Sequence, residues 1–189
     1  DEKLVMTLPK EFSMEEGAAF PVVYITAYMM MFDLGNFRSE ETILIHGAGG
    51  GVGTAAIQLA QATNGNIIGT ASTWKHTKLK EMGVSSCIDY NTENVMEKVM
   101  GYTENRGVDL IIDPVGSENW KTSYKCLAPL GKLIVYGDQN FVKGKSFSLY
   151  TTLKEVFSMP KYKPMDLMSE NKSIMGYHLG RLAGAEDKT

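Results

Sequence analysis

A cluster of glycines in the first third of the chain has the composition of a phosphate-binding turn. Residues 47–53 read GAGGGVG and lie between a short apolar run at 42–46 and residues 55–62, where apolar side chains recur at helical spacing. Glycines let a ligand approach the bare backbone, and the first turn of a helix presents N–H groups that have no partner within the helix. These N–H groups and the positive end of the helix dipole favour an anion. The pattern therefore predicts that the pyrophosphate of a dinucleotide binds at residues 50–53.

The same turn has two other interpretations. A tight connection between a strand and a helix uses glycines without binding any ligand, so the glycine pattern alone does not establish a site. A nucleoside-triphosphate loop needs a lysine followed by serine or threonine, but Thr54 stands at the lysine position. The strand pattern before the glycines and the helix pattern after them favour the dinucleotide.

The residues that follow the next predicted strand decide which dinucleotide fits. An NAD site carries an acidic residue there, about twenty residues past the glycines, to hold the ribose hydroxyls. Residues 70–80 read TASTWKHTKLK and contain no acid; they offer the hydroxyls of Ser72 and Thr73 and the ammonium groups of Lys75 and Lys78. Such a set can hydrogen-bond and neutralise a 2′-phosphate, so the sequence predicts NADP(H) in preference to NAD(H). The two lysines can also belong to a solvated helix face.

Alternating strands and helices must position these residues. Strand patterns start near residues 43, 66, 86, 108 and 132, with helical patterns between them at 74–82, 92–102 and 117–126. This cadence indicates repeated βα units, so we expect an α/β fold: a Rossmann doubly wound parallel sheet of about six strands, with helices on both faces. In such a sheet the ligand binds where the strand order reverses, over the ends of the strands at 42–46 and 108–113.

The two ends of the chain have less regular patterns. A Ser-x-x-Glu capping box at 13–16 predicts a helix to Phe20, which Pro21 should break or restart, and residues 22–34 are again helical. Further predictions are a loop at 140–146, a helix at 149–157, an irregular connection at 160–169 and a sixth strand at 173–179. We expect one nucleotide-binding domain over 1–189, made of a helical lead-in at 1–40, a core at 41–179 and a polar tail at 180–189.

Composition excludes several classes of function. With 19 basic and 22 acidic residues and a net charge of −3, the chain has no electrostatic footprint for nucleic acid. We expect no apolar stretch to reach the roughly 18–20 residues of a membrane span. Cys87, Cys126 and the three histidines are not at metal-ligand spacing, so we expect no metal site and two reduced thiols in a cytoplasmic protein.

Several stretches together resemble the cofactor domain of the medium-chain dehydrogenase/reductase superfamily, quinone-oxidoreductase branch. They are Thr26–Tyr28, ILIHGAGGGVGTAAIQLA at 43–60, IIGTAS at 67–72 with Lys75, and the segments 88–90, 107–114 and 131–137. Within that branch the chain is similar to the synaptic vesicle VAT-1 group, through FPVVYITAYMMMFDLGNF, CIDYNTENV, DPVGSENW and IMGYHLGRL.

The resemblance implies a set of cofactor-binding residues. The pyrophosphate would lie on Gly47, Ala48, Gly50, Gly51, Val52 and Gly53. Ser72 and Lys75 would meet the 2′-phosphate, and Tyr90 would lie at the adenosine end. The ribose would be bordered by Val115 and Gly116, and the nicotinamide half approached by Thr26, Tyr136, Gly137 and the backbone at His178 and Leu179. Tyr90 can instead be a packed surface aromatic, and for the His178 imidazole we favour a residue that ends an edge strand.

The resemblance also implies an activity. Enzymes of this branch transfer a hydride from NADPH to a small quinone or enone without zinc, and the protein supplies orientation rather than a nucleophile. They also have an N-terminal barrel-like domain and a C-terminal continuation, which we expect to be absent here, so this segment would bind NADPH but turn over little and contain no catalytic residue. A homodimer through the last strand is expected. The alternative is a non-catalytic nucleotide-binding or scaffold module peripheral to vesicle membranes.

Overall fold

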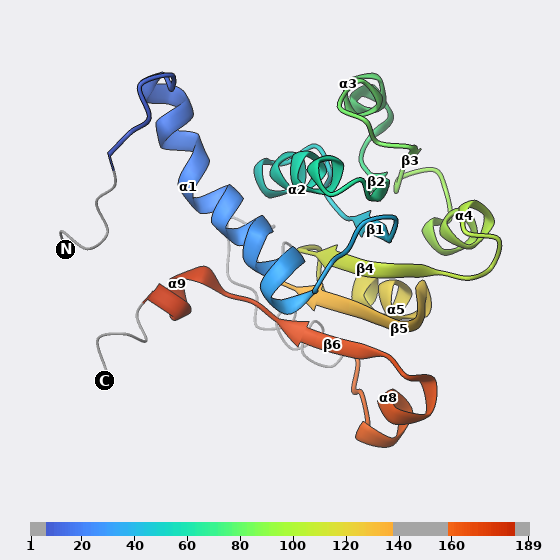
Figure 1. Ribbon diagram of the computed structural model, residues 1–189. Coiled ribbons are helices and arrows are strands. Elements are labelled where there is room, and N and C mark those ends of the chain that lie inside the picture. The colour runs from blue at the N-terminus through green and yellow to red at the C-terminus, as the bar shows by residue number, and fades with distance from the viewer. Residues whose placement is uncertain (1–6, 138–158, 184–189) are drawn as a thin grey trace, which may run out of the picture.

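A single parallel sheet forms the centre of the protein. The computed structural model describes residues 7–137 and 159–183 (Figure 1). Its strands are β1 Thr42–Ile45, β2 Asn66–Thr70, β3 Ser86–Ile88, β4 Val108–Asp113, β5 Leu127–Val135 and β6 Ser173–Gly176. They pair in the order β3-β2-β1-β4-β5-β6, and every pair is parallel. This is the predicted doubly wound sheet, and its order reverses between β1 and β4.

Helices cover both faces of the sheet. One face carries α1 Met14–Tyr28, the π-helix η2 Met29–Leu34, α2 Gly51–Ala62 and α3 His76–Glu81. The other carries α4 Val95–Tyr102, α5 Ser117–Lys125 and α8 Pro164–Glu170. Two shorter elements, the 3-10 helix η3 Thr73–Lys75 and α9 Leu179–Ala183, follow β2 and β6. Because strand residues alternate between the faces, β1 divides its side chains between two separate hydrophobic clusters.

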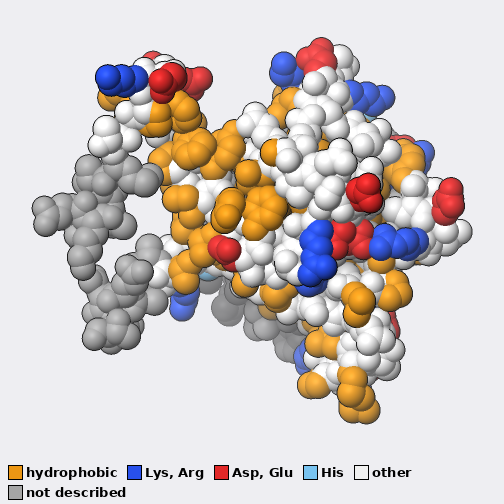
Figure 2. Space-filling model, viewed as in Figure 1, with side chains coloured by type: hydrophobic (Ala, Val, Ile, Leu, Met, Phe, Trp, Pro, Cys, Tyr) orange, Lys and Arg blue, Asp and Glu red, His pale blue; other side chains and the backbone are white. Residues whose placement is uncertain are grey.

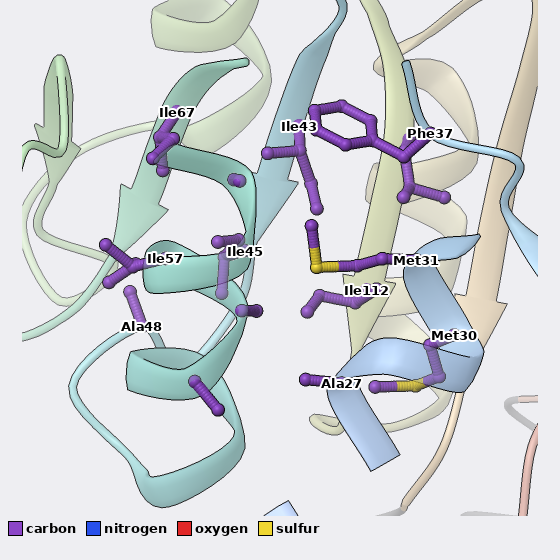
Figure 3. Packing of buried hydrophobic residues seen from close by; sticks show 14 of the residues in the cluster. Ala27, Met30, Met31, Phe37, Ile43, Ile45, Ala48, Ile57, Ile67 and Ile112 are labelled. Carbon is purple, nitrogen blue, oxygen red and sulfur yellow. The ribbon is translucent and has the colours of Figure 1, made fainter. Parts of the chain in front are cut away.

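The larger cluster joins the lead-in helix to the sheet (Figure 3). Met30 and Met31 are fully buried and lie against the β1 and β4 residues Ile43 and Ile112. On the other side of Ile45, α2 packs its own small and aliphatic side chains onto the sheet. This packing therefore fixes the C-terminal ends of β1 and β4. The predicted ligand site lies at these ends.

Pro21 does not break the lead-in helix, which corrects the prediction from the sequence. It lies inside α1, and α1 continues directly into η2. Ser13 and Glu16 form the expected capping box, with reciprocal hydrogen bonds of 2.8 and 3.1 Å between each backbone N–H and the other side chain. The proline removes one bond to the Gly17 carbonyl, and that part of the helix is exposed enough for water to replace it.

The uninterrupted helix also corrects the expectation about membrane spans. Residues Met14–Leu34 form 21 helical residues with a mean hydropathy of 1.4, which by length and composition alone is enough to cross a membrane. Only 22% of its most apolar window is buried. Figure 2 shows the apolar surface that this helix leaves uncovered, to which Met14, Val22, Ile25 and Tyr28 contribute.

Several other boundaries differ from the predictions. Helix α2 begins at Gly51 rather than near residue 55, because the glycines at 51 and 53 adopt helical backbone angles instead of forming a separate loop. Strand β5 begins at Leu127, before Gly131 rather than after it, and its register with β4 shifts between Val108 and Leu110.

The region after β5 also differs from its prediction. Residues 160–169 are not an irregular connection throughout, since α8 begins at Pro164 after the N-cap residue Lys163. Strand β6 ends at Gly176, and α9 occupies part of the predicted polar tail. The predicted loop at 140–146 and helix at 149–157 lie outside the described residues.

Candidate nucleotide-binding site

The glycine turn joins β1 to α2 and leaves the start of that helix open. Gly47 has a φ of 63°, a left-handed conformation that glycine adopts without strain, and Ala48 is fully buried. The N-cap residue of α2 is Gly50, so no side chain caps the helix. The first N–H groups of α2 are therefore available to an anion from outside, as the sequence predicted for residues 50–53.

Gly53 holds α2 close to the turn. A Cβ atom at this position would lie 2.5 Å from the Gly47 carbonyl oxygen and 2.7 Å from both Cα and the carbonyl oxygen of Ala48. All three are backbone atoms, which cannot rotate away. The close approach of the helix to the preceding turn thus requires glycine at residue 53, and it sets where the helix N-terminus lies.

The predicted 2′-phosphate residues come together at the end of β2. The hydroxyls of Ser72 and Tyr90 lie 3.1 Å apart, and Lys75 Nζ donates to the Gly49 carbonyl at 3.1 Å. Lys75 Nζ also lies 5.1 Å from the centre of the exposed Trp74 ring. The side chain of Lys75 therefore spans from the end of β2 onto the glycine turn.

One acid that the sequence does not place near this cluster is brought there by β3. Asp89 is only 7% exposed, and one carboxylate oxygen accepts from both the backbone N–H and the hydroxyl of Thr73. The other accepts from the backbone and side-chain N–H groups of Asn91, each at 2.9 Å. The Thr73 hydroxyl, together with the Asn91 backbone, lowers the pKa of Asp89 to about 2. Asp89 is thus occupied in holding the turn that carries Ser72 and Lys75.

A second glycine turn follows β4. Gly116 has a φ of 132° and is the N-cap residue of α5, and the Val115 N–H donates to Asp113 Oδ1 at 2.8 Å. Because β4 is the neighbour of β1, this turn lies beside the glycine turn at the point where the strand order reverses. Val115 and Gly116 therefore lie next to the glycine turn, and their role at a ribose stays a prediction.

Of the residues expected around the nicotinamide, Tyr136, Gly137 and His178 line one cavity, whereas Thr26 and Leu179 are not part of its lining. It has a volume of about 370 Å³ at the ends of β5 and β6, and its lining includes Tyr136, Gly137, Tyr177 and His178. Burial raises the pKa of the Tyr136 hydroxyl well above its ordinary value. Thr26 is buried on α1, and its hydrogen bond to Tyr177 opposes the rise that burial causes in the pKa of that phenol.

His178 and Leu179 lie beyond the last strand rather than on it. The N–H of Arg181 donates to His178 Nδ1 at 3.2 Å, and Leu179 is the first residue of α9. The exposed imidazole accepts this N–H at the start of the short helix, so His178 does not end the edge strand as we expected.

A buried chain of polar side chains beneath these turns was missed from the sequence. It contains Thr70, His46, Ser123 and Asp113, each at most 2% exposed. Thr70, His46 and Asp113 are at or next to the ends of the neighbouring strands β2, β1 and β4. The sequence feature that could have indicated this chain is a polar residue at the end of each of three apolar strand runs. Trp120, which also lines the cavity, was likewise missed.

Side chains that could bind a metal ion are dispersed in the described part of the chain. Within residues 7–137 and 159–183, no group of three or more His, Cys, Asp or Glu side chains is arranged to hold a metal. Cys126 is buried and Cys87 half-buried, and both are free thiols. Four features of the candidate site lie along one edge of the sheet instead. They are the open start of α2, the second glycine turn, Lys75 and the cavity at the ends of β5 and β6.

Comparison with known proteins assigns the same region to a family of cofactor-binding domains. The zinc-binding dehydrogenase family model matches residues 51–188. The chain is 40% identical over 176 residues to the synaptic vesicle membrane protein VAT-1 homolog of Danio rerio. The aligned residues make up 93% of this chain and 36% of that protein. The chain thus spans well under half the length of this relative.

Solved structures agree with this assignment. The human synaptic vesicle membrane protein VAT-1 homolog-like protein superposes with a TM-score of 0.72 and 31% identity, over 97% of this chain and 47% of that one. A quinone oxidoreductase of Pseudomonas syringae pv. Tomato DC3000 gives a TM-score of 0.76 and 26% identity, over 97% of this chain and 52% of that one.

Proposed function

Since the chain belongs to the zinc-binding dehydrogenase family, within the medium-chain dehydrogenase/reductase superfamily, we propose that it is a domain that binds NADP(H). The observation that carries this proposal is the glycine turn. Gly50 leaves the start of α2 without a side-chain cap, and Gly53 lets the helix approach the Gly47 carbonyl more closely than any other residue would allow. A tight connection without a ligand can also use the close approach at Gly53, but it gains nothing from an uncapped helix start, which is where a pyrophosphate would bind.

The preference for NADP(H) over NAD(H) rests on the end of β2. Ser72 and Tyr90 offer hydroxyl groups 3.1 Å apart, and Lys75 offers an ammonium group that reaches the glycine turn. The nearby carboxylate of Asp89 is taken up by Thr73 and Asn91. In NAD sites a free carboxylate holds the ribose hydroxyls at this position. An added phosphate would therefore be attracted here rather than repelled.

In the full-length protein, the bound nicotinamide would supply hydride to a small quinone or enone. The role of this chain is to hold the nicotinamide in the cavity beside Tyr136 and His178, with the rest of the cofactor fixed by the two glycine turns. The proposed reaction is independent of zinc, since the cysteines and histidines are not at metal-ligand spacing. This segment by itself would bind cofactor and contribute no catalytic side chain.

Partners and location form part of the same proposal. Strand β6 is at the edge of the sheet, and pairing of this edge with a second copy would give a homodimer. Relatives are named as synaptic vesicle membrane proteins, and the uncovered apolar side of α1 would suit peripheral contact of an otherwise cytoplasmic protein with a membrane.

Calorimetric titration with NADPH and NADH tests the proposal on the wild type and on Lys75→Ala. Loss of the Lys75 ammonium should weaken NADPH binding by about fivefold, equivalent to about 1 kcal/mol for a partly exposed charge pair, and leave NADH binding unchanged. Lys78→Ala is the matched control: the sequence also offered this lysine, but its side chain is 76% exposed and pairs with Glu81 on the solvated face of α3. Equal, weak affinity of the wild type for both nucleotides would overturn the assignment.

A further inference from the structure

The buried polar chain beneath the two glycine turns connects them by successive hydrogen bonds. Thr70 Oγ1 lies 3.2 Å from His46 Nδ1, His46 Nε2 lies 3.0 Å from Ser123 Oγ, and Ser123 Oγ donates to Asp113 Oδ2 at 2.7 Å. Thr70 is in β2, Ser123 in α5 and Asp113 in β4, and His46 directly follows β1. Buried polar groups of this kind are costly unless each is paired, so the chain is a specific arrangement rather than a by-product of packing.

The partners of Asp113 fix the direction of every hydrogen bond. Its carboxylate receives the Ser123 hydroxyl, the Asn119 amide at 2.7 Å and the Val115 N–H at 2.8 Å, all of them donors. Ser123 has one proton and gives it to Asp113, so Ser123 Oγ must accept from an N–H at His46 Nε2. Burial of His46 favours a neutral ring, and in a neutral ring with its proton on Nε2 the other nitrogen, Nδ1, is a lone pair that accepts the Thr70 hydroxyl. We therefore assign His46 as neutral, with its proton on Nε2.

Burial agrees with a neutral imidazole at this position. His46 is 2% exposed, and desolvation lowers its pKa, although the negative charge of Asp113 acts in the opposite direction. Asp113 Oδ2 lies 3.9 Å from His46 Nε2, with the Ser123 hydroxyl bonded to both. The serine therefore separates the ring from the carboxylate and prevents direct proton sharing between them.

Both ends of the chain are attached to backbone of the candidate site. At one end, Thr70 Oγ1 accepts the N–H of Gly47 at 3.4 Å, and the Thr70 carbonyl accepts the N–H of Ala48 at 3.0 Å. At the other end, Asp113 Oδ1 accepts the N–H of Val115. The chain therefore runs without interruption from the pyrophosphate turn to the turn expected to border the ribose.

We propose that Thr70, His46, Ser123 and Asp113 are positioning residues that fix the spacing of the two turns for nucleotide binding. Their effect on the affinity for a nucleotide rests on the proposed function, whereas the tautomer of His46 does not depend on it. None of them needs to touch the nucleotide. Loss of one link should weaken NADPH and NADH alike, because both share the pyrophosphate and the nicotinamide ribose.

Nitrogen-15 NMR of the free protein tests the hydrogen-bond directions without any ligand. At about pH 7, the signals of His46, assigned by their loss in His46→Gln, should show a neutral ring protonated at Nε2. A ring protonated at Nδ1, or at both nitrogens, would overturn the proposed chain. This measurement is independent of whether the nucleotide assignment holds.

Paired variants at Thr70 test the positioning role. Thr70→Val keeps the shape but removes the hydroxyl and should raise the Kd for NADPH by about tenfold, the factor for loss of about 1.4 kcal/mol. Thr70→Ser keeps the hydroxyl and should retain wild-type affinity. The reverse order would show that volume, not the hydrogen bond, matters, and would overturn the proposal.

Ser123→Ala tests the middle of the chain against a neighbouring control. It should weaken both nucleotides about tenfold, with an unchanged ratio of the two affinities. Tyr124→Phe, the next residue of α5, removes a buried hydroxyl for which the described residues offer no partner, and should leave binding unchanged. Equal effects of the two variants would refute the positioning role. A wild type that binds neither nucleotide would remove the proposed function and this role while leaving the tautomer result in place.

Discussion

Gly53→Ala is the substitution for which the structure predicts the clearest loss. The added methyl group would lie 2.5 Å from the Gly47 carbonyl oxygen and 2.7 Å from two atoms of Ala48, closer than Cβ atoms approach other atoms in proteins. Because these neighbours are backbone, either α2 or the turn must move. Such a shift displaces the N–H groups at the helix start from the place where the pyrophosphate is proposed to bind.

Two opposing terms set the magnitude. Alanine inside a helix is favoured over glycine by about 0.5–1 kcal/mol. Overpacking against a rigid neighbour costs about 1–3 kcal/mol. We therefore expect Gly53→Ala to lower the free energy of unfolding by about 1–2 kcal/mol, with a fall in Tm of about 2–4 °C for each kcal/mol in a domain of this size.

Gly101→Ala provides the matched control. Gly101 is an exposed residue of α4, and a Cβ there would meet no atom within 4 Å. The same substitution should therefore stabilise the protein, by about 0.4–1 kcal/mol. Urea unfolding gives both changes, and calorimetry should show NADPH binding at least about tenfold weaker in Gly53→Ala and unchanged in Gly101→Ala. If Gly53→Ala is as stable as Gly101→Ala and binds NADPH normally, the close approach of α2 to the turn is not what the site requires.

Further predictions concern acid stability and the thiols. The pKa of Asp89 is about 2 in the folded protein and lower than its ordinary value of 3.8, so its contribution to stability is present above about pH 4 and is lost as the pH falls to about 2. Urea unfolding at a series of pH values should show that the contribution of Asp89 to this pH dependence is lost in Asp89→Asn. The contribution of Glu93, whose pKa is lowered by Lys98, should persist. A pH profile of stability that is unchanged in Asp89→Asn would contradict the Thr73 contact. Burial raises the pKa of Cys126 to about 11, so a thiol reagent should label Cys126 in Cys87→Ser only as fast as the protein unfolds. Labelling of the native protein as fast as that of a free thiol would show that Cys126 is not buried.

The regular part of the fold was predictable because local pattern and tertiary structure agree there. The apolar runs at β1 and β4 are strands covered on both faces, and turn residues separate them from helices of ordinary length. The parallel order and the position of the reversal follow from the connections, since right-handed βα units leave few alternatives. The grouping of Lys75 with the glycine turn followed from the same topology.

The errors arose where one local signal was given too much weight. Pro21 is tolerated because the helix is supported on both sides, by the capping box and by the buried Met30 and Met31. In α8 the opposite happened: residues 160–169 were predicted to be irregular, although Pro164 is in the first turn of a helix, where proline is favoured.

The buried polar chain could not be derived from spacing in the sequence. His46 and Ser123 are 77 residues apart and meet only because β1 pairs with β4 and α5 packs behind them. The position of Asp89 beside Thr73 depends in the same way on β3 pairing with β2. Long-range side-chain contacts of this kind depend on register and on helix placement, which periodicity does not determine.

Helix α1 is geometrically continuous, but its two halves should not unfold together. Its first half, up to Pro21, is mostly exposed, while Thr26 and Ala27 are buried against the sheet. Because Pro21 lacks an N–H, the hydrogen-bond ladder has one link fewer at the boundary between the two halves. Amide protons before Pro21 should therefore exchange with solvent by local fraying, and those near Ala27 only when the sheet itself opens. The part of the chain that unfolds together with the sheet thus begins inside this helix, not at its first residue.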